Sequence, residues 1–249
     1  MKTIVNNLAV EYIDEGSGPT ILMLHGWKDT LHTFDPLLRE FSGQYRIIRL
    51  DLPGFGASQM PPRDWDLQDY VDFVCAFIEK QNLTIDILVG HSFGGRITIK
   101  GVSNMALKPQ KIVLIAAAGL AQRRTTRNAI LAFVAKVGKV VTAIPPLSFW
   151  RKDLRRRLYE HVGRDYFASG ALRGTFLKIV GEDLANAAAN IKIPTLLIWG
   201  SEDDQTPLEE GRRIHEIIKG SQLETFQNAG HFVHKERPEQ VARRIELFI

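Results

Sequence analysis

The sequence has only one cysteine, Cys75, among its 249 residues. A single cysteine excludes an internal disulfide framework and any metal site built from several cysteines. No apolar run reaches the roughly 20 residues that a membrane-spanning helix needs, and residues 1–7 lack the apolar core of a signal peptide. These absences predict a cytoplasmic protein without stable membrane insertion.

The chain also lacks a strong excess of charge of either sign, since its net charge is +4. The charge is unevenly distributed, however: residues 120–185 carry 13 Lys and Arg against 5 Asp and Glu, and the remainder carries 19 against 23. A basic segment can mark a surface for nucleic acids, membranes or anions. No nucleic-acid-binding module is recognisable, so we expect no nucleic-acid partner and interpret the excess as a solvated helical face.

The most informative stretch is the pentapeptide at residues 90–94, which has the pattern G-x-S-x-G. It follows an apolar segment, residues 85–89, that is typical of a buried parallel strand, and it precedes residues 96–105, which suit a helix. A strand, a tight glycine turn and a helix place the serine hydroxyl at the apex of a strained turn. Ser92 is therefore a candidate nucleophile, provided that a base and an oxyanion site lie near it.

The rest of the chain alternates strand and helix patterns. The apolar patterns predict strands at residues 4–5, 8–13, 20–24, 45–51, 85–89, 111–116, 193–200 and 223–227, and helices at residues 33–41, 66–81, 96–105, 208–218 and 238–248. The first two strands form a hairpin around Asn6 and Asn7, because asparagine tolerates the positive φ of a tight turn. Repeated helix–strand units predict an α/β fold, a mostly parallel eight-stranded sheet with helices on both faces.

Residues 120–185 interrupt this alternation with helical patterns at 127–141 and 152–161 and no convincing strand. Open α/β sheets bind ligands beyond the carboxyl ends of their strands, so a helical insertion here is typical of a lid over that edge. We predict a core of residues 1–119 and 186–249 and a helical cap of residues 120–185. Three apolar cap side chains are candidates for substrate contact, together with Trp27 of the core: Phe149, Trp150 and Phe176.

The base and the acid should lie on loops at the same sheet edge. His231 follows the last predicted strand and fits best as the base, with His234 as the fallback. Asp203 and Asp204 follow the strand at 193–200, and both qualify by position as the carboxylate that orients the imidazole.

The oxyanion hole needs two backbone N–H groups aimed at the oxygen that becomes negative. One belongs to Phe93, which follows the serine, and the other to Trp27, in the loop after the strand at 20–24. His25, at the end of that strand, is expected to orient or pack this loop.

Five blocks together resemble the α/β-hydrolase superfamily, in particular its capped serine hydrolases of the carboxylesterase type. They are His25-Gly26-Trp27, residues 51–58, residues 89–95, the Gly200-x-x-Asp203-x-x-x-Pro207 block and residues 230–238, in the family's order over nearly the whole chain. The resemblance implies the α/β-hydrolase fold, a cap inserted after the sixth strand, and a Ser92–His231–Asp203 triad in which Asp204 is only a neighbour.

These residues predict a serine hydrolase that cleaves a carboxylic ester of a small or medium acyl group through an acyl-enzyme, without a metal or cofactor. Activity should rise through roughly pH 6–7, because a histidine base acts only when neutral. The expected partner is a small-molecule ester, and the expected state is a monomer or a homodimer.

Two alternatives stay open. Residues 92–96 also resemble the elbow of the menaquinone-pathway lyase of this superfamily, which implies carbon–carbon hydrolysis or elimination on an anionic substrate by the same triad; residues 27–30 depart from that lyase's early loop. The other alternative is a binding protein that uses a hydrolase scaffold without catalysis.

Overall fold

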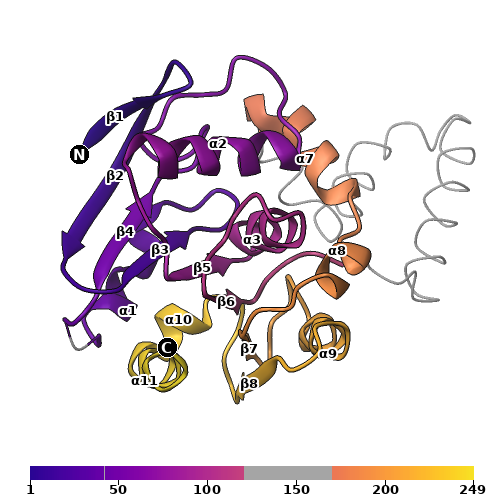
Figure 1. Ribbon diagram of the computed structural model, residues 1–249. Coiled ribbons are helices and arrows are strands. Elements are labelled where there is room, and N and C mark those ends of the chain that lie inside the picture. The colour runs from indigo at the N-terminus through magenta and orange to yellow at the C-terminus, as the bar shows by residue number, and fades with distance from the viewer. Residues whose placement is uncertain (42, 121–169) are drawn as a thin grey trace, which may run out of the picture.

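The computed structural model describes residues 1–41, 43–120 and 170–249. Its centre is an eight-stranded sheet with the order β1-β2-β4-β3-β5-β6-β7-β8 (Figure 1). The strands are β1 (Lys2–Val5), β2 (Leu8–Gly16), β3 (Thr20–Leu24), β4 (Arg46–Leu50), β5 (Ile87–His91), β6 (Lys111–Ile115), β7 (Thr195–Gly200) and β8 (Gln222–Phe226). Strand β2 is antiparallel to both neighbours, and the pairs from β4 to β8 are parallel. The predicted mostly parallel eight-stranded sheet is confirmed.

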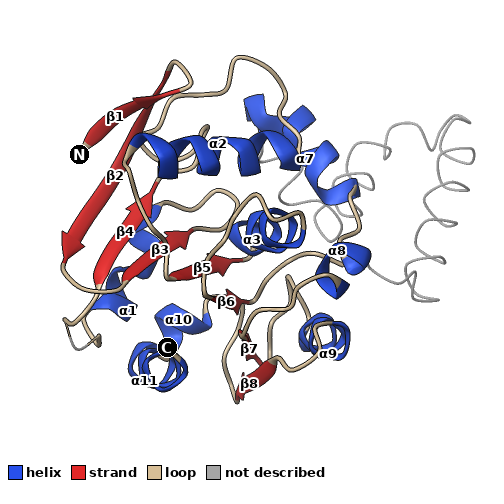
Figure 2. Ribbon diagram, in the orientation of Figure 1, coloured by secondary structure: helices blue, strands red, loops and turns tan. Residues whose placement is uncertain are grey.

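Helices cover both faces of this sheet (Figure 2). One face packs against α2 (Leu67–Lys80), α3 (Phe93–Ser103), α8 (Ala185–Ala189) and α9 (Leu208–Ile217), and the other against α1 (Asp35–Leu38), α10 (Val233–Glu236) and α11 (Pro238–Phe248). Strand β3 shows how the sequence builds two cores. Leu22 and Leu24 belong to the first core and Ile21 and Met23 to the second, because side chains alternate across a strand.

Local sequence signals explain most element boundaries. Asn6 and Asn7 have φ of 48° and 63°, as the predicted hairpin turn requires. Asp66 caps α2 through a capping box: its carboxylate accepts the N–H of Asp69, and the Asp69 carboxylate accepts the N–H of Asp66. Helix α11 begins at Pro238, where the missing N–H has no helical partner to lose.

Several predicted boundaries differ from the structure, and those around the first helix and Ser92 matter most here. The helix expected at residues 33–41 is a 3-10 turn (Leu31–Phe34) followed by the short α1, because Thr30 caps the turn and a proline stands in the first turn of α1. Strand β5 ends at His91, two residues later than expected, and α3 begins at Phe93, three residues earlier than expected. Strand and helix thus meet at Ser92, which makes the turn between them tighter than predicted.

The expected cap lies only partly in the described residues. A 3-10 turn (Gly170–Leu172) and α7 (Arg173–Gly181) belong to its C-terminal part, and the expected boundary at 185/186 falls inside α8. The helical patterns at 127–141 and 152–161, and with them Phe149 and Trp150, lie outside the described residues. Over the described ranges, no helix is both long and apolar enough to cross a membrane.

Candidate active site

Ser92 occupies a strained turn between β5 and α3. Its φ is 49°, a value that non-glycine residues adopt at a cost of about 1–3 kcal/mol. The Ser92 N–H donates to the carbonyl of Ile115 at 3.0 Å, and the Ser92 carbonyl accepts the N–H of Arg96 at 3.2 Å. A Cβ on Gly94 would overlap the carbonyl oxygen of Leu24, and one on Gly90 would overlap the carbonyl of Gly94. Glycine at both positions therefore lets the turn close around the serine.

Ser92 lines a cavity of about 310 Å³, which we call the Ser92 cavity. His231, Trp27 and Gln205 also line it, so the candidate nucleophile and base and one candidate oxyanion residue share one space. A second cavity of about 290 Å³ shares Trp27, Lys28 and Asp29 with the first. Its lining includes the apolar side chains of Phe55, Met60 and Leu172.

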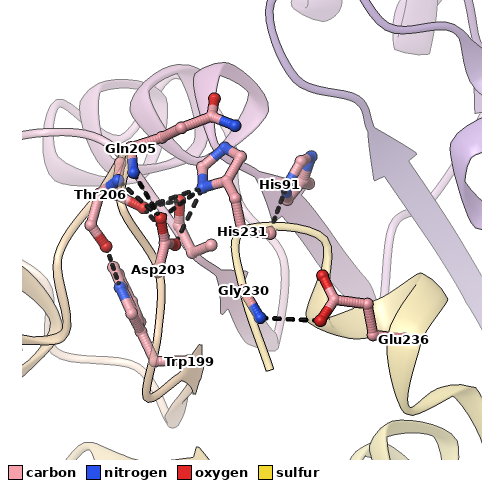
Figure 3. Close-up of polar contacts among 9 residues, drawn as sticks. His91, Trp199, Asp203, Gln205, Thr206, Gly230, His231 and Glu236 are labelled. Atoms are coloured by element: carbon pink, nitrogen blue, oxygen red, sulfur yellow. Dashed lines mark hydrogen bonds and ion pairs between the residues drawn. The ribbon is translucent and has the colours of Figure 1, made fainter. Parts of the chain in front are cut away.

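Asp203 and His231 form a direct, buried hydrogen-bonded pair (Figure 3). His231 Nδ1 lies 2.9 Å from Asp203 Oδ2 and 3.1 Å from Oδ1. The carboxylate also accepts the N–H groups of Gln205 and Thr206, at 2.9 and 2.8 Å, and the Thr206 hydroxyl at 2.8 Å. Since a carboxylate accepts, Nδ1 of the imidazole carries the proton, and Nε2 of the neutral ring is left to accept one.

The two candidates for the acid and the two candidates for the base have different surroundings in the structure. Asp203 is buried against His231, whereas Asp204 is exposed. His234, the fallback base, is fully buried in α10 and does not line the Ser92 cavity. Its Nε2 lies 3.1 Å from Oγ1 of Thr33.

The turn after β3 carries Trp27, one of the two candidate oxyanion-hole residues. His25 Nδ1 donates to the carbonyl of Gly26 at 2.7 Å, and its Nε2 accepts the N–H of Leu52 at 2.9 Å. His25 is buried, and this burial lowers its pKa, so the ring is neutral and orients the turn as expected. Phe93 is the first residue of α3, where a helix has N–H groups without helical partners.

Aromatic rings join this turn to the described end of the expected cap. The Trp27 ring lies 4.9 Å from Phe55, 5.3 Å from Phe93 and 5.3 Å from Phe176 of α7, centroid to centroid. Trp27 and Phe176, both expected near substrate, are thus brought together.

Two contributors to this site were not identified from the sequence. Thr206 adds the hydroxyl that supports Asp203, and its position three residues after Asp203 was the available signal. His91 donates to the backbone of His231, although it stands inside the G-x-S-x-G pattern itself.

A family model described as "Alpha/beta hydrolase family" matches residues 21–244. The chain belongs to the alpha/beta hydrolase family. The match spans β3 to α11 and thus includes all the elements that carry the candidate site.

One relative and two solved structures show what the chain is similar to. The chain is 27% identical to (E)-2-((N-methylformamido)methylene)succinate hydrolase of Acinetobacter baylyi, over 98% of this chain and 95% of that protein. It superposes on an esterase from Exiguobacterium antarcticum with a TM-score of 0.76 and 24% identity, covering 100% and 99% of the two chains. A meta-cleavage product hydrolase from Pseudomonas fluorescens gives a TM-score of 0.75 and 21% identity, covering 100% and 96%. The names of these three proteins describe hydrolases of different kinds.

Proposed function

We propose that this hydrolase cleaves a carboxylic ester of a small or medium acyl group through an acyl-enzyme on Ser92. The observation that carries the proposal is the buried Asp203–His231 pair facing the cavity that Ser92 lines. A serine hydroxyl needs an adjacent base, and a carboxylate on Nδ1 holds the imidazole in the tautomer that can act as one.

The proposed steps use only residues of this chain. His231 Nε2 takes the proton of the Ser92 hydroxyl as Oγ attacks the acyl carbon, and the backbone N–H groups of Trp27 and Phe93 stabilise the oxyanion. The alcohol leaves with the proton from His231. Water then attacks the acyl-enzyme with His231 again as the base, which releases the acid and returns the proton to Ser92.

The test is hydrolysis of p-nitrophenyl acetate, butyrate and octanoate by the wild-type protein and by Ser92→Ala. We expect Ser92-dependent turnover, and the profile over the three chain lengths measures how long an acyl group the site accepts. A fluorophosphonate probe should label the wild-type protein and not the variant. An unlabelled wild-type protein without turnover would refute the proposal.

A second candidate function is carbon–carbon hydrolysis or elimination on an anionic substrate by the same residues. The observation that favours it is the pair of lysines in the lining of the Ser92 cavity, Lys28 and Lys235. Asp29, the one carboxylate among the described residues of that lining, pairs with Lys235 at 3.2 Å and also accepts the Thr33 hydroxyl at 2.5 Å and the Thr30 N–H at 2.9 Å, so the lining holds one more lysine than carboxylates. The name of the Acinetobacter relative also describes a succinate derivative, which carries carboxylates.

These two functions are separated by paired substrates of similar size. The p-nitrophenyl hemiester of glutarate carries a carboxylate that the valerate ester lacks. An ester hydrolase without charge preference turns over both at similar kcat/KM, whereas a site for anions favours the glutarate ester and loses this preference at high salt. Turnover of a dicarboxylate diene without turnover of either ester would favour the second candidate.

A further inference from the structure

His91 is buried between three parts of the candidate site. It is the last residue of β5 and directly precedes Ser92, and only 1% of its surface is exposed. Its ring centroid lies 4.9 Å from that of His231 and 4.4 Å from that of His234. A Cβ on Gly26 would lie 2.9 Å from His91 Nδ1, so the turn after β3, which carries Trp27, packs directly on this ring.

The hydrogen bonding of His91 fixes its tautomer. His91 Nε2 lies 3.1 Å from the carbonyl oxygen of His231, and a dashed line marks this contact in Figure 3. A carbonyl oxygen only accepts, so His91 Nε2 carries the proton and donates it. Burial, together with the charges of His234 and His231, lowers the pKa of His91 well below the usual value, so the ring is neutral and Nδ1 is a bare acceptor. Nδ1 is buried and has no partner among the described residues.

His91 also lines the Ser92 cavity, so its ring belongs to the candidate site and does not only fill the core. His91 Nε2 donates a hydrogen bond to the main-chain carbonyl of His231, the residue proposed as the base. We propose that His91 is a positioning residue, whose N–H donation to the His231 carbonyl holds the base at the distance that Asp203 and Ser92 require. This inference rests on the proposed role of His231 and names a further residue for the same reaction.

The arrangement explains why the constraint comes from residue 91 in particular. His91 and Ser92 are covalent neighbours, so the donor that fixes the base moves with the nucleophile. His231 is held at its side chain by Asp203 and at its backbone by His91, and these two residues lie on different elements. Together the two bonds restrict movement of both the backbone and the side chain of His231, which keeps the base in place for Ser92.

The matched pair His91→Gln and His91→Met tests the proposal. Both variants remove the ring and have similar length, but only glutamine keeps an N–H donor. We expect kcat of the Met variant to fall about 5- to 10-fold below that of the Gln variant, the value of one neutral hydrogen bond, with KM changed much less. The same pair at His234, which donates to Thr33 and not to the base, should show a Gln-to-Met ratio near one.

A spectroscopic readout separates positioning from packing. The proton shared by His231 Nδ1 and Asp203 should give a far-downfield NMR signal in the wild-type protein and the Gln variant, and a weakened or shifted signal in the Met variant. Equal kcat and an unchanged signal in both variants overturn the proposal. If the Met variant does not fold, His91→Phe keeps the ring without the donor and takes its place.

Failure of the proposed function is recognised separately. A wild-type protein that shows no Ser92-dependent turnover refutes the hydrolase mechanism, and the NMR comparison still reports whether His91 holds His231. Ser92-dependent turnover with equal kcat in the two His91 variants refutes the positioning role alone.

Discussion

Two buried histidines, three residues apart, are each coupled to an aspartate but in opposite settings. His231 donates directly to Asp203 and lines the Ser92 cavity. His234 is fully buried, and its Nε2 meets the hydroxyl of Thr33, which in turn donates to Asp29 at 2.5 Å. Because the one hydroxyl proton of Thr33 goes to Asp29, His234 Nε2 must donate to Thr33.

The difference shows what makes a histidine usable as a base. At His231 the carboxylate is in direct contact and can stabilise a positive imidazolium, while the opposite edge of the ring faces a cavity. At His234 a neutral hydroxyl separates the ring from the carboxylate, and burial, with the charges of Lys235 and His231, lowers the pKa of His234 to about 3. Burial alone would raise the pKa of Asp29, but hydrogen bonds from Thr33 and Thr30 and the charge of Lys235 lower it. The second pair is therefore a structural link and not a proton acceptor for substrate.

The contrast between His231 and His234 is tested most directly by the same substitution at both histidines. His231→Gln should lower kcat by about 10⁴-fold or more, because no group remains to take the Ser92 proton. His234→Gln should keep most of the activity and lose stability instead, since it alters a fully buried ring. Ester hydrolysis and urea unfolding of the two variants check this. An equal loss of kcat in both would show that the base has been assigned wrongly.

The next largest effect is expected when the direct carboxylate is replaced. Asp203→Asn should lower kcat by about 10³- to 10⁴-fold, because the amide can donate to Nδ1 and then favours the wrong imidazole tautomer. Asp29→Asn, the matched change in the other pair, should lower kcat far less, since a hydroxyl separates Asp29 from its histidine. Steady-state kinetics of both variants give the contrast. Comparable losses would mean that direct contact between carboxylate and imidazole does not matter.

The sequence predicted the residues of the first pair better than those of the second. Apolar periodicity and the order of five blocks located Ser92, Asp203 and His231 on three loops of an eight-stranded sheet, because parallel strands bring their carboxyl ends to one edge. The link from His234 through Thr33 to Asp29 joins segments 201 residues apart. No spacing rule predicts such a contact, since it depends on how α10 packs against the turn before α1.

The local geometry of the elbow was also beyond the sequence pattern. The glycines indicate a tight turn. Because Ser92 adopts a positive φ, however, α3 begins already at Phe93, and no capping residue in the sequence predicts that start. The sequence pattern places His91 in the turn before the serine and assigns it no role, whereas the structure makes it the last residue of β5. Its bond to the His231 carbonyl spans 140 residues and appears only when β5 and the loop after β8 are brought together.

The buried position of His234 predicts acid instability. The folded state holds this ring neutral down to about pH 3, whereas the unfolded chain takes up the proton below about pH 6.5. Stability is therefore fully present above pH 6.5 and is lost as the pH falls, by about 1.4 kcal/mol per unit, or about 3 kcal/mol between pH 6 and 4. His234→Gln should remove this part of the pH dependence. Urea unfolding at both pH values measures it, with the exposed His32→Gln as control; an unchanged slope in His234→Gln would contradict the assignment.

A buried carboxyl whose pKa is raised should show the opposite trend with pH. Glu210, in α9, is buried, and this burial raises its pKa to about 7 despite the nearby charges of Arg213 and Arg96. The folded state then binds a proton that the unfolded chain has released above about pH 4.5, so stability falls as the pH rises through this window.

The expected loss from this carboxyl is about 2 kcal/mol between pH 5 and 6.5. Glu210→Gln removes the charge and should be more stable than wild type at pH 7.5, with little difference at pH 5. Glu209→Gln, at the exposed neighbour, is the matched control. Asp203 shows why the effect is specific to Glu210: backbone and hydroxyl donors already compensate the buried charge of Asp203, as well as the imidazole. If the free energy of unfolding of Glu210→Gln differs from that of wild type by the same amount at all pH values, the carboxyl stays charged. The nearby arginines are then sufficient to stabilise its charged form.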